Sequence, residues 1–237
     1  MIEVFKQLAI KDVILLSLVI NVFLFLLSIT FFYIFSRLSN NQRLQSQRQK
    51  VTIEDILVSL LVLVCNALVF VVGFLFWQKG MLIVQESTNG LRIIVEVVFL
   101  VLIMDFLMYV FHRIAHLPFF YKLIHLRHHH HQSTNAISLF VLHPIEALGF
   151  GSLIILVIFI YPFSYLAISI YLFVNLLWGT IGHLDKEVLP DKFSARLKTV
   201  FVGTTRFHNN HHQNPHCNYG FYTVIWDKLF GTLHHHL

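Results

Sequence analysis

Long runs of hydrophobic residues alternate with short polar connectors along most of this chain. The runs at 13–35, 53–77 and 91–111 each match the roughly 20 residues that an α-helix needs to cross a bilayer. Two further runs, 143–161 and 163–182, are separated only by Pro162. They predict a helical hairpin that either crosses the membrane or enters it and returns. The pattern therefore predicts an all-α integral membrane protein with about four to five transmembrane helices, three spans plus a hairpin.

Composition supports this fold class. Hydrophobic residues make up 57% of the 237 positions, whereas charged residues make up only 12%. A chain this poor in polar side chains cannot cover a water-soluble globule, so lipid must solvate much of its surface. The net charge of +5 is spread between the apolar runs without a basic stripe, which disfavours a nucleic-acid partner.

Basic residues set the expected orientation. The connector at 37–50 carries Arg37, Arg43, Arg48 and Lys50 but no acidic residue, so the positive-inside rule assigns it to the cytoplasm. Alternation then returns the third span to the cytoplasm at its end. Either form of the hairpin leaves everything after residue 182 on that same side. We expect a bacterial inner-membrane protein whose first apolar run is a retained anchor.

The domain organisation follows from these runs. Residues 1–90 are expected to form N-terminal transmembrane helices and connectors, and residues 91–237 a catalytic region with a cytoplasmic helical cap. Both belong to a single membrane domain.

Histidine is confined to the second part of the chain. None occurs in the first 111 residues, and 16 follow. Eight of them form three boxes: His112 and His116; His125, His128 and His129; His208, His211 and His212. Spacings of three and four gather the members of a box on one side of a helix, and converging imidazole nitrogens are typical transition-metal ligands. Eight donors exceed the capacity of one ion, so the boxes predict two metal ions at the membrane face.

The remaining histidines receive separate interpretations. His183 ends the hairpin on the same side and is expected to be a ligand, with an interface histidine as the alternative. His130 and His131 point away from the face of their box and are not expected to bind. His143 and His216 are interpreted as structural, or as hydrogen-bonding partners of ligands. The histidines at 234–236 are given no role, since they are either frayed or the remnant of a tag.

Asp105 and Tyr109 lie two turns and one turn before His112, on nearly the same helical face. An aspartate inside a spanning helix is costly unless it has a partner. We expect Asp105 to accept a hydrogen bond from the outer nitrogen of a ligand histidine, with Tyr109 in the same layer. The alternative is an ion pair with Arg92 or Arg113.

The chain resembles the fatty acid hydroxylase/sterol desaturase superfamily in an ordered set of motifs between residues 91 and 232. In order, these are Asp105-x3-Tyr109-x2-His112-Arg113-x2-His116, His125-x2-His128-His129, His143-Pro144-Ile145-Glu146, His208-x2-His211-His212, Asn218-Tyr219-Gly220 and Trp226-Asp227-x2-Phe230-Gly231-Thr232. Two positions depart from the family pattern. Val141-Leu142 stands where an arginine is frequent, and Gly179 stands where some members have one more ligand.

The resemblance implies a non-haem di-iron oxygenase that uses O2 to hydroxylate or desaturate a lipid. It implies nine ligands: His112, His116, His125, His128, His129, His183, His208, His211 and His212. Zinc in place of iron stays open, because histidine ligation discriminates poorly between them. The sequence contains no dinucleotide fingerprint, so electrons are expected from a separate protein. Its docking surface would be Lys186, Lys192, Arg196 and Lys198, which are equally well explained as positive-inside anchors.

Two other functions stay open. A metal transporter would hold its ligands at the membrane midplane, whereas these boxes lie at the ends of the spans. A catalytically silent lipid-binding relative would be expected to lack at least one box histidine. The lipid itself, whether sterol, fatty acyl, sphingoid or ether lipid, is not indicated by any motif.

Overall fold

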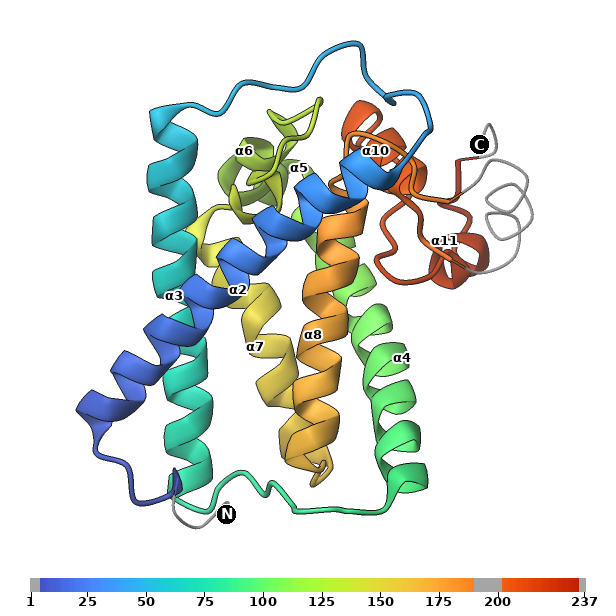
Figure 1. Ribbon diagram of the computed structural model, residues 1–237. Helices are drawn as coiled ribbons and strands as arrows, with labels where there is room; N and C mark the ends of the chain where they lie inside the picture. Colours follow the sequence, from blue (N-terminus) through green and yellow to red (C-terminus); the bar gives the residue numbers. More distant parts are fainter. Residues whose placement is uncertain (1–4, 190–201, 235–237) are drawn as a thin grey trace.

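The computed structural model describes residues 5–189 and 202–234, and within these ranges the chain is helical and contains no β-strand (Figure 1). Four helices are long and apolar enough to cross a membrane: α2 (Ile10–Leu38), α3 (Ile53–Gln78), α4 (Gly90–Ala115) and α8 (Tyr165–Gly182). A shorter apolar helix, α7 (Pro144–Ile160), precedes α8 in the chain and packs against α3 and α4. The predicted all-α, multi-pass membrane fold is confirmed.

The hairpin of α7 and α8 runs the full depth of the bundle. At its tip, the backbone N–H of Gln85, in the link between α3 and α4, donates to the carbonyl of Phe163, and the Tyr165 N–H donates back to Gln85. Ser164 also hydrogen-bonds through its backbone and hydroxyl to Glu96 of α4. Because the tip meets the far ends of α3 and α4, the hairpin crosses the same thickness as they do.

The histidine boxes lie together at the opposite end of the bundle (Figure 1). The short elements there are α5 (Pro118–Phe120), the π-helix η1 (Tyr121–His125), α6 (Leu126–His129), η2 (Ser138–Phe140), α10 (Thr205–Gln213) and α11 (Ile225–Leu229). The connector between α2 and α3 lies on this side too, since Arg48 pairs with Asp185 at 2.8 Å. The expected convergence of all three boxes on one side is therefore confirmed.

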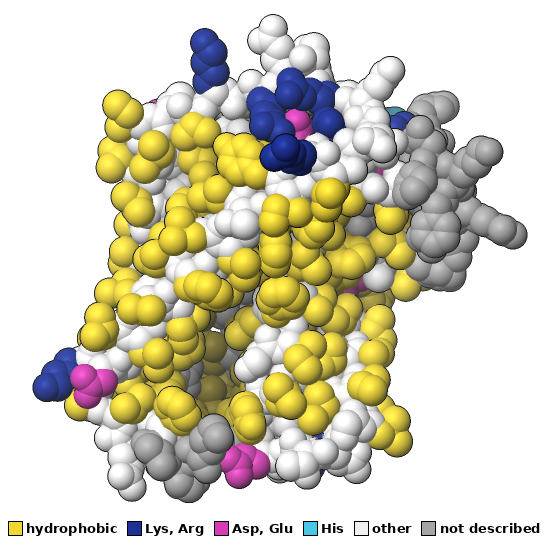
Figure 2. All heavy atoms as spheres, viewed as in Figure 1, with side chains coloured by type: hydrophobic (Ala, Val, Ile, Leu, Met, Phe, Trp, Pro, Cys, Tyr) yellow, Lys and Arg dark blue, Asp and Glu magenta, His cyan; other side chains and the backbone are white. Residues whose placement is uncertain are grey.

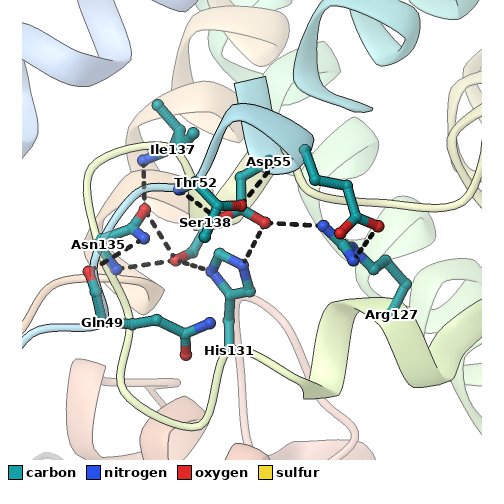
Figure 3. Close-up of polar contacts among 9 residues, drawn as sticks. Gln49, Thr52, Asp55, Arg127, His131, Asn135, Ile137 and Ser138 are labelled. Atoms are coloured by element: carbon teal, nitrogen blue, oxygen red, sulfur yellow. Dashed lines mark hydrogen bonds and ion pairs between the residues drawn. The ribbon is translucent and has the colours of Figure 1, made fainter. Parts of the chain in front are cut away.

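A buried polar cluster fixes the second box to α3. His131 lies between Ser138, at 2.8 Å, and Asp55, at 3.2 Å, and Asp55 also accepts a hydrogen bond from Arg127 (Figure 3). Asp55 forms a capping box with Thr52 at the start of α3. The helix start and the histidine loop therefore hold each other in place.

The sides of the bundle are strongly apolar. Figure 2 shows hydrophobic side chains over α2 and α8, with Lys and Arg gathered at the histidine end and a hollow between the helices lower down. On α2, Leu15 is 62% exposed and Phe23 is 60% exposed. Such exposure of large apolar side chains suits contact with lipid.

Candidate metal centre

The nine histidines predicted as ligands form two adjacent groups. The first contains His112, His116, His125, His129 and His211. The second contains His128, His183, His208 and His212. Within each group the ligand atoms lie within 4.8 Å of one another. Each group therefore offers enough nitrogens for one metal ion.

The second and third boxes each contribute to both groups. His125 and His129, four residues apart, belong to the first group, whereas His128 belongs to the second. The third box does the reverse, because His208 and His212 belong to the second group and His211 to the first. In each box the first and last histidines are four residues apart and share one helical face. The middle histidine directly precedes the last one and is turned away from it. The HxxHH spacing therefore bridges two centres, where a single helical side was expected.

Nitrogen–nitrogen distances suit a coordination sphere. Two histidine nitrogens that bind the same metal ion in neighbouring coordination positions, each at about 2.1 Å from it, lie about 3 Å apart. In the first group, Nε2 of His125 lies 3.1 Å from that of His112 and 3.2 Å from that of His129. In the second group, Nε2 of His183 lies 3.2 Å from that of His208 and 3.3 Å from that of His128. The Nε2 atoms thus converge in both groups.

The outer ring nitrogens of four of these histidines have acceptors. Nδ1 of His112 donates to the Tyr219 carbonyl, and Nδ1 of His211 donates to the Cys217 carbonyl at 2.6 Å. Nδ1 of His183 donates to the carbonyl of Gly179, and Nδ1 of His125 donates to Glu146. A proton held on Nδ1 leaves the Nε2 lone pair free for a metal.

Burial keeps these rings neutral. Desolvation lowers the pKa of His129 to about 3 and that of His183 to about 4. The same cause, with repulsion from neighbouring histidines, lowers the pKa of His128, His208, His211 and His212 well below the ordinary value. Neutral imidazole is the form that binds metal. The buried Nε2 of His211 has no hydrogen-bond partner among the described residues, as expected of an atom placed for a metal.

Asp105 does not contact a histidine, so the expected role of its carboxylate is wrong. It accepts hydrogen bonds from the backbone and side chain of Thr223, from the Tyr222 N–H and from the indole N–H of Trp226. The alternative pairing with Arg92 or Arg113 is also wrong, since Arg92 pairs with Glu96 and Arg113 donates to the Tyr109 hydroxyl. Asp105 instead ties α4 to the turn that follows Tyr219.

Tyr109 also lies outside the reach of the ligand nitrogens. Its hydroxyl bonds Thr232 at 3.0 Å and accepts a hydrogen bond from Arg113, and its ring stacks on Phe230. Tyr109 meets the edge of Tyr219, whose carbonyl accepts from His112. Tyr109 therefore contacts the C-terminal segment and not the ligand nitrogens.

Glu146 is the carboxylate that sequence reasoning missed. It is fully buried, and Oε1 lies 2.6 Å from Nδ1 of His125. The other oxygen, Oε2, has no partner among the described residues. Its signal in the sequence was the acidic residue of the His143-Pro144-Ile145-Glu146 motif, which was noted without a role.

The remaining histidines lie outside both groups. His130 and His216 are exposed, and His131 is held by Asp55 and Ser138. His143 caps α7 by accepting the Ile145 N–H, which confirms a structural role. Of the histidines at 234–236, the last two lie outside the described residues.

An apolar cavity of about 670 Å³ leads from the histidines into the bundle. His112 and His125 of the first group and His128, His183 and His208 of the second line its inner end. The rest of its wall comes from α2, α3, α4, α7 and α8, with side chains such as Leu24, Phe70, Met104, Phe150 and Leu172. The cavity therefore brings apolar side chains and both groups of histidines into one space.

Comparison with known proteins agrees with this geometry. Residues 97–232 match the fatty acid hydroxylase family. The chain is 26% identical to a cholesterol 25-hydroxylase-like protein of Danio rerio, over 70% of this chain and 66% of that protein. It is 28% identical to lathosterol oxidase of Rattus norvegicus, over 64% and 50%, and 30% identical to a Delta(7)-sterol 5(6)-desaturase of Eremothecium gossypii, over 60% and 38%.

The chain thus spans between about a third and two thirds of the length of these relatives. No solved structure matches it. The family match covers more than half of the chain and includes all nine clustered histidines. The chain belongs to the fatty acid hydroxylase family.

Proposed function

We propose that this protein is a membrane-bound di-iron oxygenase that hydroxylates or desaturates a lipid with O2 and electrons from a separate donor. The observation that carries the proposal is the pair of buried histidine groups at the inner end of an apolar cavity. The named relatives act on sterols, which supports a lipid substrate. All nine clustered histidines are proposed as ligands.

Iron bound at these groups would supply the activation of O2 needed to remove hydrogen from an unactivated C–H bond. Histidine-only donors fit iron and also zinc. The protein's own part begins with Glu146 and the carbonyls of Gly179, Cys217 and Tyr219, which fix ring orientation and keep Nε2 unprotonated.

The cavity performs the second part of the work. Its apolar wall excludes water from the inner end and holds a hydrocarbon segment beside His112, His128 and His208. The helices of residues 1–90 supply part of this wall, through Leu24 of α2 and Phe70 of α3, so the catalytic region at 91–237 depends on them. Placement of the substrate carbon against the centre would decide between hydroxylation and desaturation.

Electrons would arrive at the histidine end, which the basic connector suggests is cytoplasmic. Arg43, which is 49% exposed, lies there with Arg48 and Lys186, and Figure 2 shows the resulting basic surface. Of the residues expected to dock a donor, Lys192, Arg196 and Lys198 lie outside the described residues. Reversal of Arg43 to Glu should slow turnover with a protein donor but not with a small chemical reductant.

The direct test uses protein in nanodiscs, supplied with a membrane lipid extract, a reductant and 18O2. Mass spectrometry should find a lipid that gains 18O, or one that loses two hydrogens. His128→Ala should abolish that product, and His130→Ala, a change of an exposed neighbour, should not. Equal turnover in wild type and His128→Ala would refute the proposal.

A further inference from the structure

Three asparagines line the apolar cavity from three different membrane helices. They are Asn21 of α2, Asn66 of α3 and Asn175 of α8. Amide side chains within membrane spans are unfavourable unless they have partners, and they commonly mark functional positions. The apolar wall around them makes their presence there more significant.

The three amides share one level of the bundle. A core cluster that includes Val62, Phe140 and Leu176, with Phe25 packed against it, lies between this level and the histidines. Asn21 is one turn from Phe25 on the side away from the histidines. On α3, Asn66 lies one turn after Val62, again on the side away from the histidines. On α8, Asn175 directly precedes Leu176. They therefore form a polar layer within the cavity, which we call the asparagine layer.

Their hydrogen-bonding capacity is incompletely used. Asn66 has no hydrogen-bond partner among the described residues. Asn21 donates to the Ser17 carbonyl, which leaves its side-chain oxygen free to accept. The Asn175 oxygen accepts from the Tyr222 hydroxyl, which leaves its amide N–H groups free to donate. The layer thus offers both donors and acceptors to a bound molecule.

The charge of the cavity wall indicates which chemical group of a ligand the asparagine layer can bind. Among the described residues that line the cavity there is no Lys or Arg. The acidic residue of the wall, Glu146, lies at the histidine end against His125. A carboxylate or phosphate at the asparagine layer would be desolvated without a counter-charge, whereas a hydroxyl needs only one donor and one acceptor.

We propose that the asparagine layer binds the hydroxyl of a neutral lipid alcohol, whose hydrocarbon part extends to the histidines. Asn175 precedes His183 by eight residues, about 12 Å along the helix. The carbon that reacts is therefore remote from the hydroxyl. This inference rests on the proposed function for its reaction, but the binding site stands on its own geometry.

Binding to the full chain in nanodiscs tests the proposal with two pairs of probes. Each pair compares an alcohol with its hydrocarbon: cholesterol with 5-cholestene, and octadecanol with octadecane. Wild type should bind the alcohol of at least one pair about tenfold more tightly, the effect of one buried hydrogen bond. Asn66→Leu should remove that preference while binding the hydrocarbon as wild type does, which also shows that it folds.

Two further variants sharpen the result. Thr30→Val removes an exposed hydroxyl of α2 that bonds its own helix, and it should keep the preference. His128→Ala should also keep it, although oxidation is lost, so failure of the proposed function and failure of the binding site are distinguishable. Wild type without preference in either pair, or Asn66→Leu with the preference intact, would overturn the proposal.

Discussion

The Nδ1 atom of His125 donates a 2.6 Å hydrogen bond to Oε1 of Glu146, and both side chains are buried. On the other side of the ring, Nε2 of His125 lies 3.1 Å from Nε2 of His112. The carboxylate therefore fixes the tautomer that presents a lone pair to the first histidine group. Glu146 belongs to α7, so this hydrogen bond ties the hairpin to the second box.

Replacement of Glu146 by Gln should weaken metal binding by about 10–100-fold, because the charged acceptor of a ligand histidine is lost. Titration of apoprotein with Fe(II) measures this directly. Glu54→Gln is the matched control, since Glu54 pairs with Arg127 in an exposed ion pair. Equal affinity in Glu146→Gln and wild type would show that the bond does not tune the site.

Asp105→Asn should lower stability by about 1–3 kcal/mol, because a buried carboxylate that accepts four hydrogen bonds becomes an amide. Thermal unfolding in detergent gives the measurement. The exposed Asp12→Asn, at the start of α2, serves as the control. An unchanged midpoint for Asp105→Asn would contradict its role as the anchor between α4 and the C-terminal turn.

Gly220→Ala should disturb the site through the backbone. A Cβ at Gly220 would lie 2.3 Å from the carbonyl oxygen of Thr223, far inside contact distance. The turn would have to shift, and with it the Tyr219 carbonyl that accepts from His112. We expect loss of activity together with a lower unfolding midpoint.

Gly90→Ala is the control for this substitution, since nothing lies within 4 Å of the added methyl group. It should leave both activity and the midpoint unchanged. Wild-type behaviour of Gly220→Ala would show that the turn tolerates the displacement.

His131→Ala should destabilise the protein by about 1–3 kcal/mol while leaving metal content unchanged. The ring is buried between Asp55 and Ser138 and belongs to neither histidine group (Figure 3). Its exposed neighbour gives the comparison, because His130→Ala should alter neither quantity. Loss of metal in His131→Ala at full stability would assign it to the site instead.

Hydrophobic patterning was sufficient to predict the helices to within a few residues. The predicted run at 53–77 became Ile53–Gln78, and the runs on either side of Pro162 became the hairpin helices. Length and apolarity decide helix formation in lipid, where each backbone group must be satisfied within its own segment. Convergence of the boxes followed from the same topology.

The partners of buried carboxylates could not be predicted in the same way. Asp105 lies on nearly the same helical face as His112, yet its bonds go to residues 222–226, more than a hundred positions later. Glu146 reaches His125 across two loops. Such contacts depend on tertiary packing, and helical periodicity carries no information about them. The division of each HxxHH box between two groups could not be predicted either, because it depends on where the other ligand histidines of each group lie.

Metal content per chain tests the central claim most directly. Purified protein reconstituted with Fe(II) should hold two ions per chain. His112→Ala and His183→Ala, one from each group, should each retain about one, the double variant should retain almost none, and His130→Ala should retain two. One ion or none in wild type, or the same loss in His130→Ala as in the group variants, would contradict a two-centre site.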